Sequence, residues 1–214
     1  MRQSRWVLPG LLAGLLAMML LALRGLDHAP APVVPASDRT GFSAERAYRH
    51  LEDLIGDNVP HPPGSAAHRV VGERIHAKLR EYGYEPEVQE GLKCSPLAPG
   101  CSMVRNIIAV RRGTGQGPAM MITAHYDSVP GSAAASDDGV GIAVMLEIAD
   151  LLAEREPMLH DVVFLFADSE ESGLRGAMLC ADAHPLMKRV GLVVNLEARG
   201  ASGPSAMFET GADN

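Results

Sequence analysis

The chain has 214 residues and a formal net charge of −7, and 47% of its residues are hydrophobic while 21% are charged. This composition is typical of a globular domain of ordinary size and excludes disordered and fibrous proteins. Because acidic residues outnumber basic ones and no basic run follows the N-terminus, the sequence predicts neither a nucleic-acid partner nor a polybasic lipid-binding surface.

The N-terminal segment, residues 1–26, differs in kind from the rest. Arg2 and Arg5 precede 18 residues without a charge, and Arg24 ends that run. At about 1.5 Å per helical residue the run extends roughly 27 Å, close to the roughly 30 Å hydrocarbon core of a bilayer. We therefore predict a cytoplasmic stub and a single-pass transmembrane signal anchor, with the rest of the chain extracytoplasmic, in a periplasm or a lumen. A cleaved signal peptide is the alternative, which the length of the run disfavours.

Residues 27–42 are rich in Pro and Ala and predict a semi-rigid linker, so residues 43–214 are assigned to one folded domain. Cys94 and Cys101 bracket a turn-rich loop, where a small disulfide ring could close in an oxidising compartment. Cys180 stands in an apolar helical stretch, which is typical of a buried free thiol.

Within that domain, apolar residues at three- and four-residue spacings predict helices, and short apolar runs between turn residues predict strands. In chain order we expect helix 43–55; helix 66–82, with Ser65 as its N-cap; strands 85–89, 106–110 and 119–123; helix 140–152; strand 162–167; helix 174–183; and strand 191–196. The alternation of strands and helices in the second half indicates an α/β fold, a three-layer sandwich around a largely parallel sheet.

Acidic and imidazole side chains follow three of these strands directly. His125 and Asp127 follow strand 119–123, the pair Glu170 and Glu171 follows strand 162–167, and Glu197 follows strand 191–196. Asp137 stands just before helix 140–152. Because the carboxyl ends of parallel strands meet at one edge of a sheet, we expect these groups to converge there.

Several carboxylates packed together repel one another unless a cation neutralises them. Imidazole nitrogen together with carboxylate oxygens suits zinc, and the absence of cysteine from the group argues against a purely structural zinc site. A pair of ions about 3.5–4 Å apart that share one carboxylate would generate hydroxide near neutral pH. The group therefore predicts a hydrolase.

Four segments carry a resemblance to a known family. Residues 125–128 (His-Tyr-Asp-Ser), 137–141 (Asp-Asp-Gly-Val-Gly), 167–173 (Ala-Asp-Ser-Glu-Glu-Ser-Gly) and 195–197 (Asn-Leu-Glu) resemble, in order and spacing, the metal-site motifs of the M28 zinc aminopeptidase family. The resemblance extends over about residues 43–209.

The resemblance implies two zinc ions and a role for each residue. His125, Asp137 and Glu197 would surround one zinc, and Asp137 would bridge to a second zinc held by Glu171. Glu170 would act as the general base, and Asp127 would orient the imidazole of His125. All four metal ligands and both catalytic residues are thus expected at one edge of the sheet.

Two departures from the family pattern stand out. Glu197 occupies a position where many members have aspartate, and we interpret it as a subfamily trait because it supplies the same oxygen. The family takes a last histidine ligand from a later loop, whereas residues 198–214 contain no histidine. We therefore expect this domain to be truncated on its C-terminal side and the second zinc to lack one ligand, in which case this chain alone could be inactive.

The favoured function is an exopeptidase that removes N-terminal residues from peptide substrates. A glutaminyl-cyclase-like or aminoacylase-like amidohydrolase is one alternative, and an inactive receptor-like homologue is another. The intact Glu170–Glu171 pair disfavours the cyclase, and the short spacing of 12 residues between His125 and Asp137 disfavours the aminoacylase. The retention of every predicted site residue disfavours an inactive protein. The sequence determines neither the preferred side chain of the substrate nor the oligomeric state.

Other polar residues are predicted to have structural roles. Asp138 and Asp168 are expected as turn or cap residues. The acidic residues on and just after helix 140–152 are expected on a solvated face: Glu147, Asp150, Glu154 and Glu156. Three histidines earlier in the chain are expected as packing or surface residues: His61, His68 and His76.

Overall fold

The computed structural model describes residues 7–26, 34–198 and 211. These residues belong to two compact units: one contains residues 7–26 and 211, and the other contains residues 34–198.

In the first unit the described element is helix α1 (Val7–Leu26), whose described side chains at residues 9–23 are exposed. Among the described residues, no helix combines the length and the hydropathy needed to cross a membrane. The structure therefore does not confirm the anchor predicted over residues 1–26, of which residues 1–6 lie outside the described residues.

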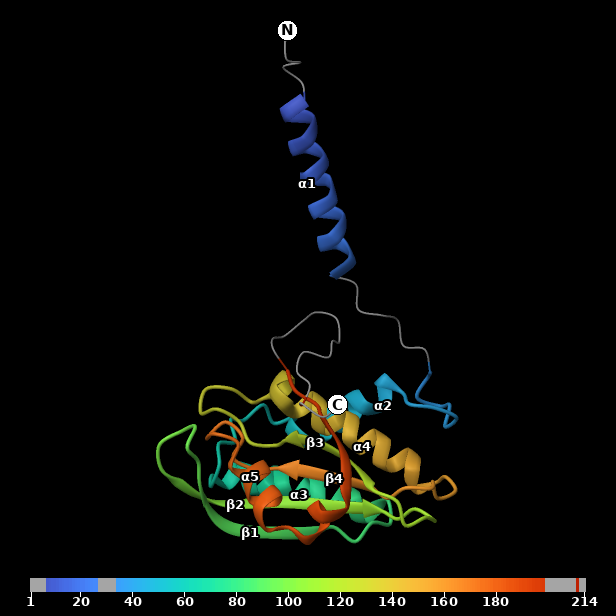
Figure 1. The fold of residues 1–214 in the computed structure, drawn as a ribbon, viewed down its shortest axis with the longest axis vertical. Coiled ribbons are helices and arrows are strands. Elements are labelled where there is room, and N and C mark those ends of the chain that lie inside the picture. The colour runs from blue at the N-terminus through green and yellow to red at the C-terminus, as the bar shows by residue number, and fades with distance from the viewer. Residues whose placement is uncertain (1–6, 27–33, 199–210, 212–214) are drawn as a thin grey trace. The chain divides into compact units, whose positions relative to one another are not determined.

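The second unit is built on a sheet with the strand order β1-β2-β4-β3-β5 (Figure 1). Its strands are β1 (Glu87–Cys94), β2 (Cys101–Arg111), β3 (Ala119–His125), β4 (Val162–Ala167) and β5 (Val190–Asn195). β3 pairs in parallel with both β4 and β5, whereas β2 pairs antiparallel with both β1 and β4. Only β2 among the described strands runs against the rest, so the predicted largely parallel sheet is confirmed.

Helices cover both faces of this sheet and make the predicted three layers. They are α2 (Ala44–Ile55), α3 (Ala66–Glu81), α4 (Val140–Ala153) and α5 (Arg175–Ala183). Phe164 and Phe166 of β4 pack in one core with α3, α4 and Leu54 of α2, while Val163 and Leu165 pack in a second core with Cys180 of α5. Because β4 is buried on both faces, its sequence is an unbroken apolar run.

The first two strands differ from their predicted ranges of 85–89 and 106–110. β1 and β2 are longer and form an antiparallel hairpin, in which Cys94 lies opposite Cys101 and the two form a disulfide. The disulfide ring that the sequence left open is therefore present, and the predicted buried free thiol of Cys180 is confirmed. The strand residues at the end of the hairpin could not be predicted from an apolar run, because this end is not buried. Leu92 and Met103, which pair across it, are both exposed.

The N-cap of α3 offers a direct test of local stabilisation. The hydroxyl of Ser65 accepts a hydrogen bond from the backbone N–H of His68 at 3.0 Å. We expect Ser65→Ala to lower the free energy of unfolding by about 1 kcal/mol, measured by urea denaturation. Ser43 has the same position in α2 without a side-chain cap bond, so Ser43→Ala is the matched control and should change little. Equal effects of the two substitutions would contradict the capping role.

Candidate functional site

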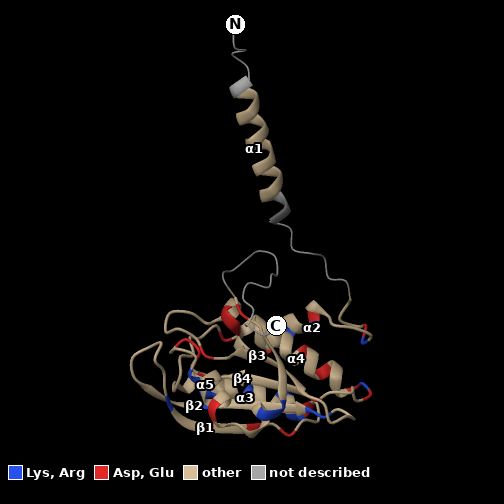
Figure 2. Cartoon of the chain, viewed as in Figure 1, with Lys and Arg blue, Asp and Glu red and all other residues tan. Residues whose placement is uncertain are grey.

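The predicted site residues converge at the carboxyl ends of β3, β4 and β5. His125 ends β3, Glu170 and Glu171 follow β4, and Glu197 follows β5. Asp137 belongs to an irregular turn, η1 (Ala135–Gly139), which lies at the same edge and appears red in Figure 2. The sheet thus brings together five side chains from four separate segments.

The imidazole of His125 is the centre of this group. Its Nε2 lies 3.0 Å from Oδ1 of Asp137, 3.8 Å from Oε1 of Glu197 and 3.9 Å from Oε2 of Glu170. The ligand atoms of His125, Asp137 and Glu171 all lie within 4.8 Å of one another. One small cation could therefore contact several of these atoms.

Asp127 fixes both the imidazole and the segment after β4. Nδ1 of His125 lies 3.2 Å from the backbone oxygen of Asp127 and 3.6 Å from its carboxylate. The same carboxylate, which is fully buried, accepts hydrogen bonds from the backbone N–H groups of Glu170 at 2.9 Å and Glu171 at 3.2 Å. A histidine held through Nδ1 presents Nε2 to a metal. The sequence does not reveal these two hydrogen bonds, because Asp127 is separated from Glu170 by 43 positions and from Glu171 by 44 positions.

The carboxyl groups of the site oppose ionisation of one another. Burial raises the pKa of Glu170 to about 7, and the negative charge of Glu197 adds to this, while His125 opposes it. Burial and the charge of Asp137 raise the pKa of Glu171. Both shifts come first from burial, and neighbouring carboxylates add to them, whereas the hydrogen bond with His125 lowers the pKa of Glu197.

Within the described part of the chain, the imidazole of His125 carries the compensating charge. Burial lowers the pKa of His125, but the carboxylates of Asp127 and Glu197 outweigh burial and raise this pKa to about 12. Among the described residues, no Lys or Arg pairs with Asp137, Glu170, Glu171 or Glu197. A divalent cation would supply the missing charge, and the set of one imidazole nitrogen and carboxylate oxygens fits zinc.

Asp138, predicted as a turn residue, has that role. Its buried carboxylate accepts hydrogen bonds from the N–H of Gly141 at 3.1 Å and from the N–H of His125 at 3.3 Å. Burial raises its pKa to about 8. Asp138 thereby ties the start of α4 to the end of β3.

Asp168 and His68 form a contact that sequence reasoning missed. Nε2 of His68 lies 2.9 Å from the buried carboxylate of Asp168, which also accepts the N–H of Arg105 at 2.7 Å. The ring of His68 stacks on Tyr126. His68 therefore has the predicted packing role. It also has a carboxylate partner, Asp168, which lies 100 residues later in the chain.

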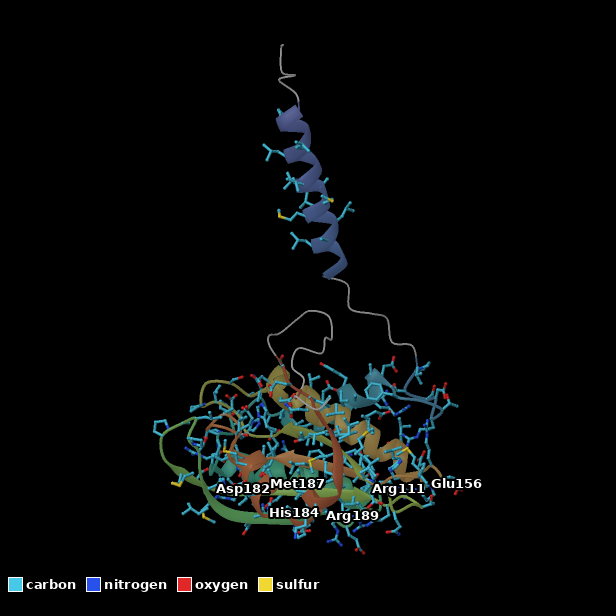
Figure 3. All side chains as sticks on the ribbon, viewed as in Figure 1. Arg111, Glu156, Asp182, His184, Met187 and Arg189 are labelled. Carbon is cyan, nitrogen blue, oxygen red and sulfur yellow. A yellow bond between two sulfur atoms is a disulfide. The ribbon has the colours of Figure 1, made fainter. Side chains whose placement is uncertain are left out.

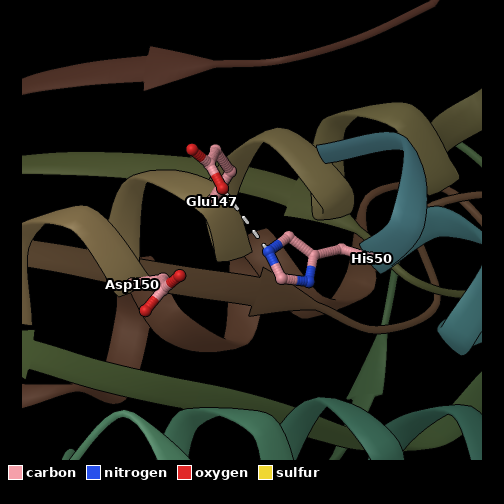
Figure 4. Close-up of side chains that lie close together, drawn as sticks. All are labelled: His50, Glu147 and Asp150. Carbon is pink, nitrogen blue, oxygen red and sulfur yellow. Dashed lines mark ion pairs between the residues drawn. The ribbon is translucent and has the colours of Figure 1, made fainter. Parts of the chain in front are cut away.

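A second histidine–carboxylate cluster comprises His50, Glu147 and Asp150 (Figure 4). The prediction that Glu147 lies on a solvated helix face is wrong: it is 0% exposed, because Arg46 of α2 donates from Nε to both of its carboxylate oxygens, at 3.0 and 3.1 Å. Arg39 pairs with Asp150 at 2.7 Å. Two arginines already neutralise these carboxylates, so we assign the cluster to an ion-pair network that joins α2 to α4.

A cleft of about 690 Å³ lies at the opposite edge of the sheet. Arg111, His184 and Arg189, labelled in Figure 3, help to line it. Arg111 ends β2 opposite Val162, the first residue of β4, whereas the candidate site follows the last residue of β4. None of the predicted site residues lines this cleft.

The sequence is similar to a known protein family and to known proteins. The profile described as peptidase family M28 matches residues 106–214, which include every predicted site residue. Endoplasmic reticulum metallopeptidase 1 of Mus musculus is 38% identical over 220 residues, covering 93% of this chain and 24% of that protein. A vacuolar membrane protease of Candida albicans is 33% identical over 177 residues, covering 82% of this chain and 21% of that protein. The chain therefore spans about a quarter or less of the length of these relatives.

Solved structures with the same fold are also similar. A glutaminyl cyclase of Porphyromonas gingivalis has a TM-score of 0.64 and 28% identity, covering 75% of this chain and 60% of that one. A Zn-dependent exopeptidase of Parabacteroides distasonis has a TM-score of 0.65 and 21% identity, covering 76% of this chain and 64% of that one, which supports the fold alone. The family profile covers about half of this chain and contains the converging residues around His125, and we conclude that the chain belongs to peptidase family M28.

Proposed function

We propose that the chain is the metal-binding part of a zinc-dependent exopeptidase, an aminopeptidase that hydrolyses N-terminal peptide bonds. The observation that carries the proposal is the convergence of His125 with four carboxylates that have no Lys or Arg partner within the described residues. Membership of a peptidase family supports hydrolysis of peptides.

The proposed metal ligands are His125, Asp137, Glu171 and Glu197. Two zinc ions are proposed, and Asp137 would help to hold both of them. Bound zinc lowers the pKa of water and polarises a carbonyl oxygen, which is the chemistry that a peptidase needs.

Glu170 is the proposed general base. Its pKa, raised by burial to about 7, suits a group that takes a proton from the attacking water and passes it to the leaving amine. Asp127 positions this residue, because its carboxylate accepts the N–H of Glu170. It also holds His125 through the contacts at Nδ1.

The proposal is tested with the full-length protein, purified with zinc and given peptides that differ only in a free or an acetylated N-terminus. An aminopeptidase releases residues one at a time from the free peptide and leaves the acetylated peptide intact. Cleavage of internal bonds, or equal rates on both peptides, would show another specificity.

A glutaminyl cyclase is the second candidate, favoured by the P. gingivalis structure at 28% identity. Such an enzyme would act on a peptide with N-terminal glutamine by releasing ammonia and closing a ring, without breaking a peptide bond. Mass spectrometry of that peptide separates the two reactions, since a peptidase releases free glutamine. The hydrolase remains favoured because Glu170 and Glu171 both face the site.

We further propose that residues 1–26 anchor the protein in a membrane and that its second unit lies outside the cytoplasm. The names of the relatives, a vacuolar membrane protease and an endoplasmic reticulum metallopeptidase, support membrane association. The Cys94–Cys101 disulfide fits an oxidising compartment. Retention of the protein in the pellet after alkaline extraction of membranes is expected, and its release would contradict the anchor.

His125→Ala is expected to lower the zinc content of the full-length protein, because it removes the only nitrogen ligand proposed within this chain. His76→Ala, a half-buried position on α3, is the matched control and should leave the zinc content unchanged. Metal analysis after dialysis measures both. An unchanged zinc content in His125→Ala would remove this residue from the ligand set.

A further inference from the structure

The segment that carries Glu170 and Glu171 has an unusual backbone conformation. Ser169 and Leu174 have φ angles of 57° and 59°, in the left-handed region that residues other than glycine rarely adopt. Such conformations persist where the surrounding structure holds them in place, and they are common at functional sites. The contacts around residues 168–174 therefore determine where both glutamates lie.

One of these contacts comes from the turn at residues 95–100, which the Cys94–Cys101 disulfide closes at its base. Gly173 packs so closely on this turn that a Cβ atom there would lie 2.8 Å from Oγ of Ser95 and 2.9 Å from Cβ of Ala98. The turn and the glutamate segment thus touch without room for a larger side chain.

Arg175, the first residue of α5, joins the two segments by hydrogen bonds. The residue is 6% exposed, and its Nη2 donates to the carbonyl oxygens of Pro99 at 2.8 Å and Gly100 at 3.0 Å. Its backbone N–H donates to the carbonyl oxygen of Ser169 at 3.1 Å. A shift of the turn would therefore reach the residue directly before Glu170.

We propose that Arg175 is a positioning residue for Glu170 and Glu171, and that the disulfide-closed turn is the support on which it acts. The oxidation state of Cys94 and Cys101 then controls the metal-binding and proton-transfer geometry of the site. This inference rests on the proposed function for its effect on turnover, but its effect on the glutamate segment does not require catalysis.

The Cys94–Cys101 disulfide can be reduced in the test with a water-soluble phosphine. The phosphine attacks one sulfur atom and breaks the S–S bond. Water then supplies the oxygen atom of the phosphine oxide and two protons, one for each sulfur, so that Cys94 and Cys101 become thiols. The disulfide gains two electrons and the phosphine loses two. A phosphine is preferred to a thiol reductant because thiols bind zinc.

The first measurement is hydrogen–deuterium exchange on the metal-free, full-length protein before and after reduction. The amides of Glu170 and Glu171 donate to Asp127, so they report the position of the segment directly. We expect them to exchange about tenfold faster after reduction, while the amides of β4 stay unchanged. In a variant with Cys94→Ser and Cys101→Ser, the phosphine should have no effect.

The second measurement is steady-state kinetics of the zinc-loaded protein. Loss of contacts that orient metal ligands and their neighbours lowers metal affinity or activity by about 10–100-fold. We expect Arg175→Met to lower kcat by about tenfold with KM changed less than twofold, and Arg175→Lys to restore part of the loss because an ammonium also donates hydrogen bonds to carbonyl oxygens. In the double-serine variant Arg175→Met should add little, since both changes act through one turn.

The outcomes separate the two proposals. If reduction lowers the melting temperature but leaves the exchange of Glu170 and Glu171 unchanged, the turn is only a structural support and the positioning proposal is overturned. If exchange accelerates but the unreduced, zinc-loaded protein cleaves no peptide, the positioning proposal stands and the proposed function fails. If Arg175→Met lowers kcat by the same factor with and without the double-serine change, the two changes act independently. That result would contradict their action through one turn.

Discussion

Glu170→Gln in the full-length protein is expected to lower kcat by about 10²–10⁴-fold while zinc stays bound, because the substitution removes the proton acceptor but no proposed ligand. The amide keeps the size of the side chain, and the backbone N–H that donates to Asp127 is retained. Steady-state kinetics and metal analysis on the same preparation measure both quantities.

Glu156→Gln is the matched control for this substitution, since Glu156 is exposed after the end of α4. It should leave kcat and zinc content unchanged. Turnover by Glu170→Gln at the wild-type rate would exclude Glu170 as the base, and loss of zinc in that variant would assign it to the metal ligands instead.

Glu147→Ala has the largest expected effect on stability. Arg46, whose side chain is also buried, would lose its carboxylate partner and remain as an uncompensated charge in the interior. Breaking a buried pair in this way costs about 3–5 kcal/mol. The loss would extend to residues 36–41, because Arg46 also donates to the backbone oxygens of Ala36, Asp38 and Gly41.

Asp57→Ala is the matched control, because it breaks the Arg74–Asp57 pair in which the side chain of Asp57 is 60% exposed. An exposed pair contributes about 0–1 kcal/mol. Chemical denaturation of both variants should therefore give clearly different losses. Similar losses would mean that the Arg46–Glu147 pair does not stabilise the fold beyond an ordinary surface contact.

Features that depend on local sequence were predictable. An unbroken apolar run predicts β4, and apolar residues at helical spacing predict α3. Ser65 directly precedes α3 and is its N-cap, as predicted. The convergence of His125, Glu170 and Glu197 was predictable because each lies at or just after the end of a strand, and parallel strands bring their ends to one edge of the sheet. His125, Glu170 and Glu197 therefore meet although they are far apart in the chain.

Features that depend on distant partners were not predictable. Glu147 has helical spacing typical of a solvated face, and only the packing of α2 against α4 brings Arg46 to it, 101 residues away. The linker predicted over residues 27–42 likewise gives no sign that residues 36–41 accept hydrogen bonds from Arg46. Arg175 stands in an apolar helix, and its partners on the disulfide-closed turn lie 75 and 76 residues upstream. Pair contacts of this kind leave no periodic signal.

The most direct test of the metal site is anomalous diffraction at the zinc absorption edge from crystals of the full-length protein grown with zinc. We predict a peak about 2.0–2.1 Å from Nε2 of His125, within reach of Asp137, Glu171 or Glu197. A map without a peak at His125, or with its zinc beside His50 and Glu147 instead, would contradict the assignment of this edge of the sheet as the metal site.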